Sequence, residues 1–158
     1  MKKKIIKKIG IGIFVLLIIA FVGAKIKRVS PLAWGHKQVN MPMFLDEAIN
    51  GYDPVAYFTA NKAVKGDNAF TYSWNGGTWY LSSQENLDLF KSNPEKYAPQ
   101  FGGYCAFAAS KGFTANTNPE AFKITGDKLY LFADKEMLQN WMEGGEESKE
   151  KSEENWKE

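Results

Sequence analysis

Apolar and polar positions alternate in short stretches along the middle of the chain, and this pattern predicts two β-hairpins. Residues 69–74 and 78–81 alternate on either side of an Asn-Gly-Gly sequence at 75–77, which is typical of a tight hairpin turn. Residues 122–124 and 129–132 flank a Thr-Gly-Asp turn and predict a second hairpin.

Capping residues and helical spacing predict helices between and after these hairpins. Ser82 with Glu85 three residues later is a capping-box pattern, which predicts a helix over 83–91. Pro94 favours the first position of a second short helix, and Asp134 is a good N-cap for a last one. The inward-facing residues of that last helix would be Met137, Leu138 and Trp141. The order of hairpin, helices, hairpin and helix predicts an α+β fold with a small antiparallel sheet of hairpins packed with short helices.

The N-terminal segment has a different pattern, that of a membrane-spanning helix. Five lysines precede an uncharged run over 9–24, and three further basic residues follow by position 28. Sixteen helical residues span about 24 Å, and flanking lysines can extend that reach by snorkelling. We expect a single-pass anchor; the alternative is a signal peptide cleaved after the small residues at 22–24. In both cases the N-terminal lysines favour the cytoplasmic side, so the globular domain is expected to be extracytoplasmic, either periplasmic or on the outer face.

The chain therefore divides into four segments. They are an anchor or signal segment at 1–28, a linker at 29–43, a globular domain at 44–142 and a charged tail at 143–158. The first segment holds eight of the twenty basic residues and no acidic one, which leaves the remainder with a net charge of −6. A mildly acidic domain lacks the basic surface that is typical of nucleic-acid-binding proteins. The tail is expected to be either a solvated helix or disordered.

Standard catalytic signatures are missing from the sequence. There is no Gly-x-Ser-x-Gly motif, no phosphate-binding loop and no paired-histidine zinc motif, and His36 is the only histidine. We therefore expect a binding domain rather than an enzyme.

Cys105 is the only cysteine, which excludes an intramolecular disulfide. It follows Gly102 and Gly103 at the start of a short helix of small residues expected over 104–109. A thiol at a helix N-terminus has a lowered pKa, which favours nucleophilic attack and metal binding. The alternative is a free cysteine buried as a small apolar side chain.

A few other side chains could join such a site. His36 can ligate a metal or act as a base. With Cys105, the thioethers of Met41 and Met43 would make a soft donor set suited to reduced copper. Asp53 either stabilises its own turn or directs a carboxylate toward Cys105.

Several long motifs are similar to bacterial proteins of one family. The matching stretches are Gly51-Tyr52-Asp53-Pro54-Val55-Ala56-Tyr57-Phe58, Trp79-Tyr80-Leu81-Ser82-Ser83-Gln84-Glu85-Asn86, Asn93-Pro94-Glu95-Lys96-Tyr97-Ala98-Pro99-Gln100 and Gly102-Gly103-Tyr104-Cys105-Ala106. With these motifs the chain resembles the YHS-domain family. The resemblance implies a domain suspected of binding heavy metals, copper above all, and YHS segments also occur beside copper-transporting ATPases.

The chain departs from the metal-type members of that family at three positions. The resemblance implies cysteines where this sequence has Ala56, Ser82 and, approximately, Asn86. All three thiols are missing, and Cys105 belongs instead to the Gly-Gly-Tyr-Cys-Ala motif of this subgroup.

We therefore expect a membrane-anchored binding domain whose ligand site is built around Cys105, Tyr104, Tyr52 and Asp53. A heavy metal such as copper is the first candidate ligand, with Cys105, Asp53 and His36 as metal ligands. Cys105 is expected in a pocket within a few ångströms of the turn that carries Asp53. One alternative is a thiol-dependent redox protein or enzyme that uses Cys105; another is a structural or interaction module without a small ligand. The sequence identifies no protein partner, and the membrane is contacted through the N-terminal segment.

Overall fold

The computed structural model describes residues 13, 14, 16, 29–41 and 46–156. Most of the expected anchor, residues 9–24, lies outside these residues. Within the part that is described, no helix is both long and apolar enough to cross a membrane.

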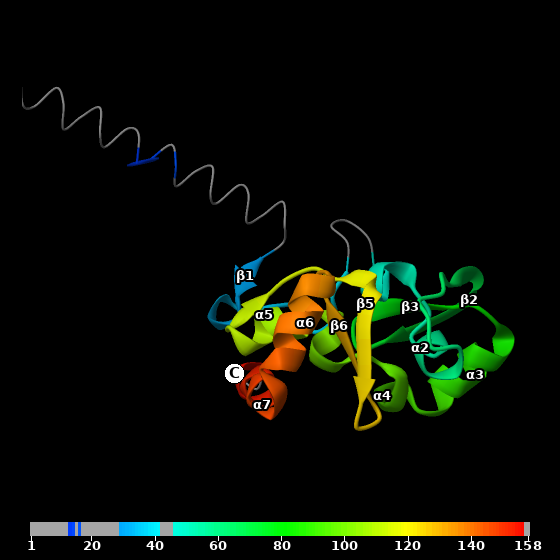
Figure 1. Ribbon diagram of the computed structural model, residues 1–158. Coiled ribbons are helices and arrows are strands. Elements are labelled where there is room, and N and C mark those ends of the chain that lie inside the picture. Colours follow the sequence, from blue (N-terminus) through cyan, green and yellow to red (C-terminus); the bar gives the residue numbers. More distant parts are fainter. Residues whose placement is uncertain (1–12, 15, 17–28, 42–45, 157–158) are drawn as a thin grey trace, which may run out of the picture.

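The described elements confirm an α+β fold, with short strands and short helices interleaved along the chain (Figure 1). In chain order they are β1 (Ser30–Pro31), η1 (Leu32–Trp34), η2 (Ala48–Gly51), α2 (Ala56–Thr59), β2 (Asp67–Trp74), β3 (Gly77–Leu81), α3 (Gln84–Ser92), α4 (Pro94–Tyr97), η3 (Gln100–Gly103), α5 (Ala106–Ser110), β4 (Phe113–Thr114), β5 (Asn118–Thr125), β6 (Lys128–Phe132), α6 (Lys135–Glu143) and α7 (Gly145–Trp156). The strands form separate antiparallel pairs, β1 with β4, β2 with β3 and β5 with β6, in place of one small sheet.

Both predicted hairpins are present, and their turns explain why the sequence signals were clear. Asn75 and Gly76 have φ values of 51° and 80°, and Gly126 and Asp127 have φ values of 56° and 57°. Two consecutive left-handed residues give a turn whose twist matches that of the flanking strands. Glycine and asparagine or aspartate tolerate this conformation best, so the turn chemistry specified the hairpins locally.

The cap of α3 differs from the prediction by one residue. Ser83, not Ser82, is the N-cap, and its Oγ accepts a hydrogen bond from the amide of Asn86 at 3.1 Å. Ser82 lies one residue earlier and directs its hydroxyl to Asp53 instead. The predicted cap of α6 is confirmed, because Asp134 Oδ1 accepts from the amide of Met137 at 2.8 Å.

Two hydrophobic cores lie on either side of β6. Leu129 and Leu131 belong to the first core, together with residues of β3 and α3, whereas Tyr130 and Phe132 belong to the second, together with residues of α5 and α6. Successive side chains of a strand point to opposite faces, so one strand serves both cores. Its uninterrupted apolar sequence follows from burial on both faces. In Figure 1 the two halves are visible as β2, β3 and α3 at one end and α5, α6 and α7 at the other.

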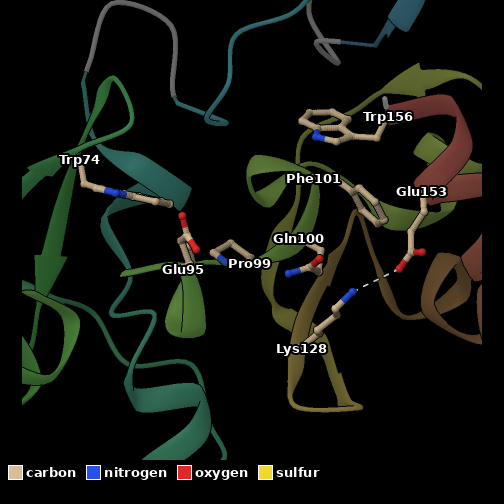
Figure 2. A pocket seen from close by; sticks show the side chains of 9 residues that line it. Trp74, Glu95, Pro99, Gln100, Phe101, Lys128, Glu153 and Trp156 are labelled. Carbon is tan, nitrogen blue, oxygen red and sulfur yellow. Dashed lines mark hydrogen bonds and ion pairs between the residues drawn. The ribbon is translucent and has the colours of Figure 1, made fainter. Parts of the chain in front are cut away.

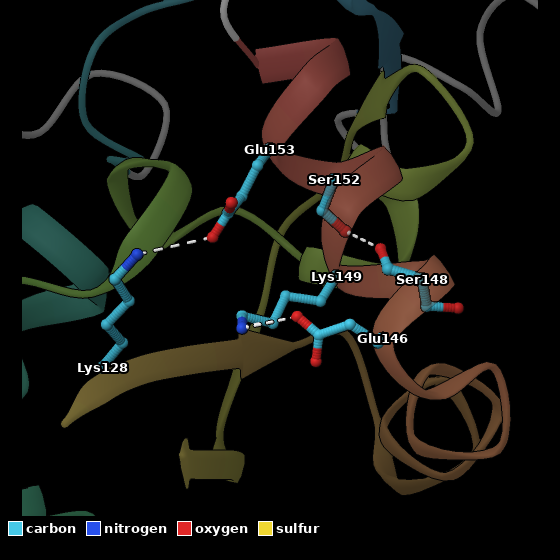
Figure 3. A network of polar contacts seen from close by, with 6 residues as sticks. All are labelled: Lys128, Glu146, Ser148, Lys149, Ser152 and Glu153. Atoms are coloured by element: carbon cyan, nitrogen blue, oxygen red, sulfur yellow. Dashed lines mark hydrogen bonds and ion pairs between the residues drawn. The ribbon is translucent and has the colours of Figure 1, made fainter. Parts of the chain in front are cut away.

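The charged tail forms α7, which packs against α5 through polar contacts. Figure 3 shows the polar contacts of α7 with itself and with β6, including that of Glu153 with Lys128. Ser152 is fully buried; its Oγ accepts from Trp141 Nε1 at 3.2 Å and lies 3.0 Å from the carbonyl oxygen of Ala106. Asn155 Nδ2 donates to the carbonyl of Ala109 at 2.8 Å. The sequence suggested a solvated helix or disorder because these buried anchors are serine and asparagine, which carry no apolar signal.

Candidate functional site

Asp53 is the most heavily hydrogen-bonded side chain of the predicted site. Its carboxylate is fully buried, and Oδ1 accepts from the amides of Val55 at 2.8 Å and Ala56 at 3.2 Å. Its Oδ2 accepts from the Ser82 amide at 2.8 Å, the Ser82 hydroxyl at 2.6 Å and Asn86 Nδ2 at 2.6 Å. Five donors occupy both oxygens, so Asp53 connects the turn before α2 to the start of α3. A carboxylate satisfied in this way would have to give up protein hydrogen bonds to bind a metal ion.

The partners of Asp53 coincide with the three positions at which this chain departs from the metal-type relatives that it resembles. Ala56, Ser82 and Asn86 come from α2, the end of β3 and α3, and each donates a hydrogen bond to Asp53. The structure therefore brings these three positions together around one point. In this chain a backbone amide, a hydroxyl and a carboxamide hold a carboxylate there.

Cys105 packs in the second core and is 1% exposed, and it also lines an open cavity beside Phe107 and Phe113, as expected for a cysteine in a pocket. It is the N-cap of α5, its amide donates to the carbonyl of Ala115 at 3.0 Å, and its backbone forms a parallel bridge with Leu131. Burial raises the pKa of the thiol, and nearby backbone hydrogen bonds, the largest from Ala108, offset only part of that effect. The expected lowering of this pKa is therefore wrong, because desolvation outweighs the short helix.

The four residues expected to form one ligand site are divided between the two halves of the molecule. The residues next to Asp53 along the chain, Val55 and Tyr57, belong to the first core, while Cys105 belongs to the second. Tyr52 is half-buried and carries the Lys65 ammonium 5.2 Å from the centre of its ring. The structure does not show the expected contact between the Cys105 thiol and the turn of Asp53: the Asp53 carboxylate is bonded to groups around the starts of α2 and α3, whereas Cys105 packs in the second core.

Tyr104 and His36 lie together in an aromatic cluster. The His36 ring packs on Trp156, with ring centres 4.1 Å apart and an interplanar angle of 31°, and Tyr104 lies 6.3 Å from His36 and 5.9 Å from Trp156. Phe101 completes the cluster at 5.8 Å from Trp156. The linker therefore packs back onto the domain, which a site that included His36 requires. At that place the His36 side chain contacts aromatic rings.

A cleft of about 480 Å³ opens beside this cluster (Figure 2). Trp74, from the end of β2, and Glu95, from α4, form one side; Phe101 and Trp156 form the other, with Glu153 beside them. The remaining lining residues are Ala98, Pro99, Gln100 and Lys128.

Sequence reasoning did not find this cleft, because its walls come from residues more than eighty positions apart. The one signal available was Trp156, a large aromatic residue in an otherwise charged tail. Such a residue in a charged segment indicates either a packing anchor or a binding surface; in this structure it packs on His36 and lines the cleft.

Comparisons with known proteins identify one domain in the chain. Residues 55–101 match the family model of the YHS domain. The match contains Ala56, Ser82 and Asn86, begins two residues after Asp53 and ends four residues before Cys105. No curated protein and no solved structure gives a significant match.

Proposed function

We propose that this chain, which belongs to the YHS-domain family, is a membrane-tethered extracytoplasmic binding domain for an organic cation. The site is the cleft between Trp74 and Trp156. The observation that carries the proposal is the combination of three aromatic rings and two carboxylates around one open space.

The aromatic walls supply the first part of the argument. Trp74, Phe101 and Trp156 line the cleft, and tryptophan has the aromatic face that attracts cations most strongly. The Trp156 ring packs against His36 and Phe101, with ring centres 4.1 Å and 5.8 Å apart. The Trp74 ring packs against Trp79, with ring centres 5.9 Å apart. Because these rings are already fixed by packing, little side-chain entropy is lost when a ligand binds.

The charges of the cleft supply the second part. Glu95 is exposed and makes no ion pair or hydrogen bond among the described residues, whereas Glu153 pairs with Lys128 at 3.4 Å. Two carboxylates and one ammonium leave the cleft with a net negative charge, which favours a cation over an anion. A volume of about 480 Å³ accommodates a small organic molecule. An alkylated ammonium group combines the positive charge with the apolar surface that the aromatic rings require.

Among the predicted copper ligands that the structure describes, each is engaged elsewhere. Asp53 is saturated by protein hydrogen bonds, burial raises the pKa of the Cys105 thiol, and His36 is packed on Trp156. Met41 is buried in the first core, and Met43 lies outside the described residues. Across residues 29–41 and 46–156, no three histidine, cysteine, aspartate or glutamate side chains gather in a way that could hold a metal ion. The raised pKa and the low exposure of the Cys105 thiol also disfavour the alternative of a thiol-dependent enzyme, since the thiolate is the reactive form.

The tether is proposed from the sequence. The uncharged run over 9–24 is bracketed by basic residues, with five lysines on its N-terminal side. This arrangement favours a cytoplasmic N-terminus and an extracytoplasmic domain. A reporter that is active only in the cytoplasm, fused after the last residue, should therefore be silent.

The binding proposal is tested with a matched pair of probes. Choline and its neutral isostere 3,3-dimethylbutan-1-ol have the same shape and differ in charge. We expect choline titrated into the full chain in detergent to change the tryptophan fluorescence, and to bind about tenfold more tightly than the isostere, since a cation–π contact contributes roughly 0.5–2 kcal/mol.

Two variants locate the binding. Glu95→Gln should weaken choline binding several-fold and leave binding of the neutral isostere unchanged, whereas Glu85→Gln, on the exposed first turn of α3, should change neither. Equal affinity for the two probes, or no binding of choline up to tens of millimolar, would overturn the proposal and favour a module without a small ligand.

A further inference from the structure

A second cavity, of about 580 Å³, borders the second core beside α5 and is lined mainly by apolar side chains, Cys105 among them. Five of its lining residues are Val29, Phe107, Lys111, Phe113 and Met137. Val29 is 37% exposed and Phe113 is 40% exposed. We call this surface the Val29–Phe113 groove.

The groove is held next to the N-terminal segment by backbone pairing. Pro31 of β1 lies opposite Phe113 of β4, and the amide of Leu32 donates to the carbonyl of Gly112 at 2.9 Å. Val29 directly precedes β1. The groove therefore cannot separate from the start of the described domain without breaking the β1–β4 pair.

The chain between the apolar run and the groove is short. Four residues, 25–28, connect Ala24 to Val29, and a fully extended chain covers at most about 3.3–3.6 Å for each residue. Val29 can therefore lie no more than about 17 Å from the end of the apolar run. The polar headgroup region is about 5–8 Å thick on each side of the bilayer, so in an anchored chain Val29 lies within about 12 Å of its outer edge, and the groove can reach the lipid surface.

Most of the large exposed apolar side chains among the described residues belong either to the apolar run or to the groove. Among the described residues, the large exposed ones are Ile13, Phe14, Leu16, Val29, Phe113 and Met142. Three of them lie in the apolar run and two lie in the groove. Exposed apolar side chains that follow an anchor closely in the sequence are within reach of the lipid that holds the anchor.

The charges at the rim agree with a headgroup environment. Lys111 is exposed and its Nζ lies 5.2 Å from the centre of the Phe107 ring, so an ammonium stands directly above an apolar face. In the sequence, three further basic residues directly precede Val29, within residues 25–28. Asp134, the acidic residue of the rim, is engaged as the N-cap of α6. Basic side chains around aromatic and aliphatic ones are typical of surfaces that lie in the membrane interface.

We infer that the Val29–Phe113 groove docks on the surface of the membrane that holds the chain, with Phe113 inserted at the level of the headgroups and Lys111 directed to anionic lipids. The inference rests on the tether of the proposed function and not on the ligand of the cleft. It adds a fixed orientation to a domain that an anchor alone would leave free to rotate.

The test uses the full chain with its N-terminal segment, reconstituted into vesicles of phosphatidylcholine with phosphatidylglycerol. Phe113→Cys is labelled with the polarity-sensitive dye NBD, and Asn75→Cys, in the exposed turn between β2 and β3, is the control. Cys105 is 1% exposed, and the unsubstituted chain measures its background labelling. We expect blue-shifted emission and several-fold weaker quenching by iodide at position 113 than at position 75.

The outcomes separate the two proposals. A chain that is not retained in the vesicle fraction contradicts the tether and the inference together. A chain that is retained but shows equal iodide quenching at both positions overturns the inference alone. Lys111→Glu should restore part of the quenching at position 113 in vesicles that contain phosphatidylglycerol; no effect there would contradict the role given to Lys111.

Discussion

Asn86 Nδ2 donates to Asp53 Oδ2 at 2.6 Å, across thirty-three positions of the chain. This contact fastens α3 to the turn before α2, and it completes a set of five donors around a buried carboxylate. The arrangement makes Asp53 a structural centre of the domain, with consequences that can be measured.

Removal of the carboxylate should destabilise the domain strongly. Asp53→Ala would leave three buried amides, a hydroxyl and a carboxamide without their acceptor, and each such loss costs about 1–3 kcal/mol before relaxation. We expect the free energy of unfolding in urea to fall by at least about 3 kcal/mol. Asp88→Ala, which removes an exposed carboxylate of α3, should change it by no more than about 0.5 kcal/mol. A loss of similar size in both variants would contradict the role given to Asp53.

Restored thiols should create a soft-metal site at the same point. Ser82 and Asn86 contact Asp53 through their side chains and Ala56 contacts it through its backbone amide, so we expect cysteines at these positions to lie close together. We expect the triple variant Ala56→Cys, Ser82→Cys, Asn86→Cys to retain about one copper(I) ion per chain after gel filtration, because several thiolates together hold a soft ion well. The single variant Ser82→Cys should retain much less. Elemental analysis measures both, and equal copper content in the two variants would refute the prediction.

The stability of the domain should fall at alkaline pH. Burial raises the pKa of Cys105 above its ordinary value of 9.0 and the pKa of Tyr57 above 10.0, so above pH 9 the folded state holds protons that the unfolded state releases. Stability then decreases as pH rises through these unfolded-state values. We expect a weaker decrease between pH 9 and 10 for Cys105→Ala, and a weaker decrease above pH 10 for Tyr57→Phe. Urea denaturation at each pH gives the free energy of unfolding, and its slope against pH is compared between each variant and the unsubstituted chain. Equal slopes would show that neither group contributes.

The C-terminal helix should depend on one buried hydroxyl. Ser152→Ala removes the acceptor of Trp141 Nε1 and the contact with the carbonyl of Ala106, so we expect a loss of about 1–3 kcal/mol in the free energy of unfolding. Lys151→Ala, on the exposed face of the same helix, should cost no more than about 0.5 kcal/mol. Protection of the α7 amides in hydrogen exchange should fall in the first variant and stay unchanged in the second.

The parts of the fold that the sequence predicted correctly are those with local signals. The hairpin turns at Asn75 and Gly126 and the cap at Asp134 each depend on residues within a few positions, and all are present. The cap of α3 was assigned to Ser82 because the capping-box spacing suits it; Asp53, far away in the sequence, competes for that hydroxyl.

The candidate site was less predictable because it depends on long-range packing. The low pKa expected for Cys105 followed from its place before a short helix, but the second core encloses the thiol and reverses the shift. Trp74 and Trp156 lie eighty-two positions apart, and neither carries a motif that indicates the other. No local pattern specifies that they face one cleft.

Strand β6 has a consequence for how the domain unfolds. A slip of one residue in its pairing with β5 would exchange the faces of Leu129 and Leu131 with those of Tyr130 and Phe132. The first core would then have to accommodate phenol and phenyl rings in a space shaped for leucine. The second core would contain voids where those rings had packed. Neither half can lose this strand without exposing the interior of its neighbour. The two halves should therefore open as one cooperative unit, with the amides of β6 among the last to exchange with solvent.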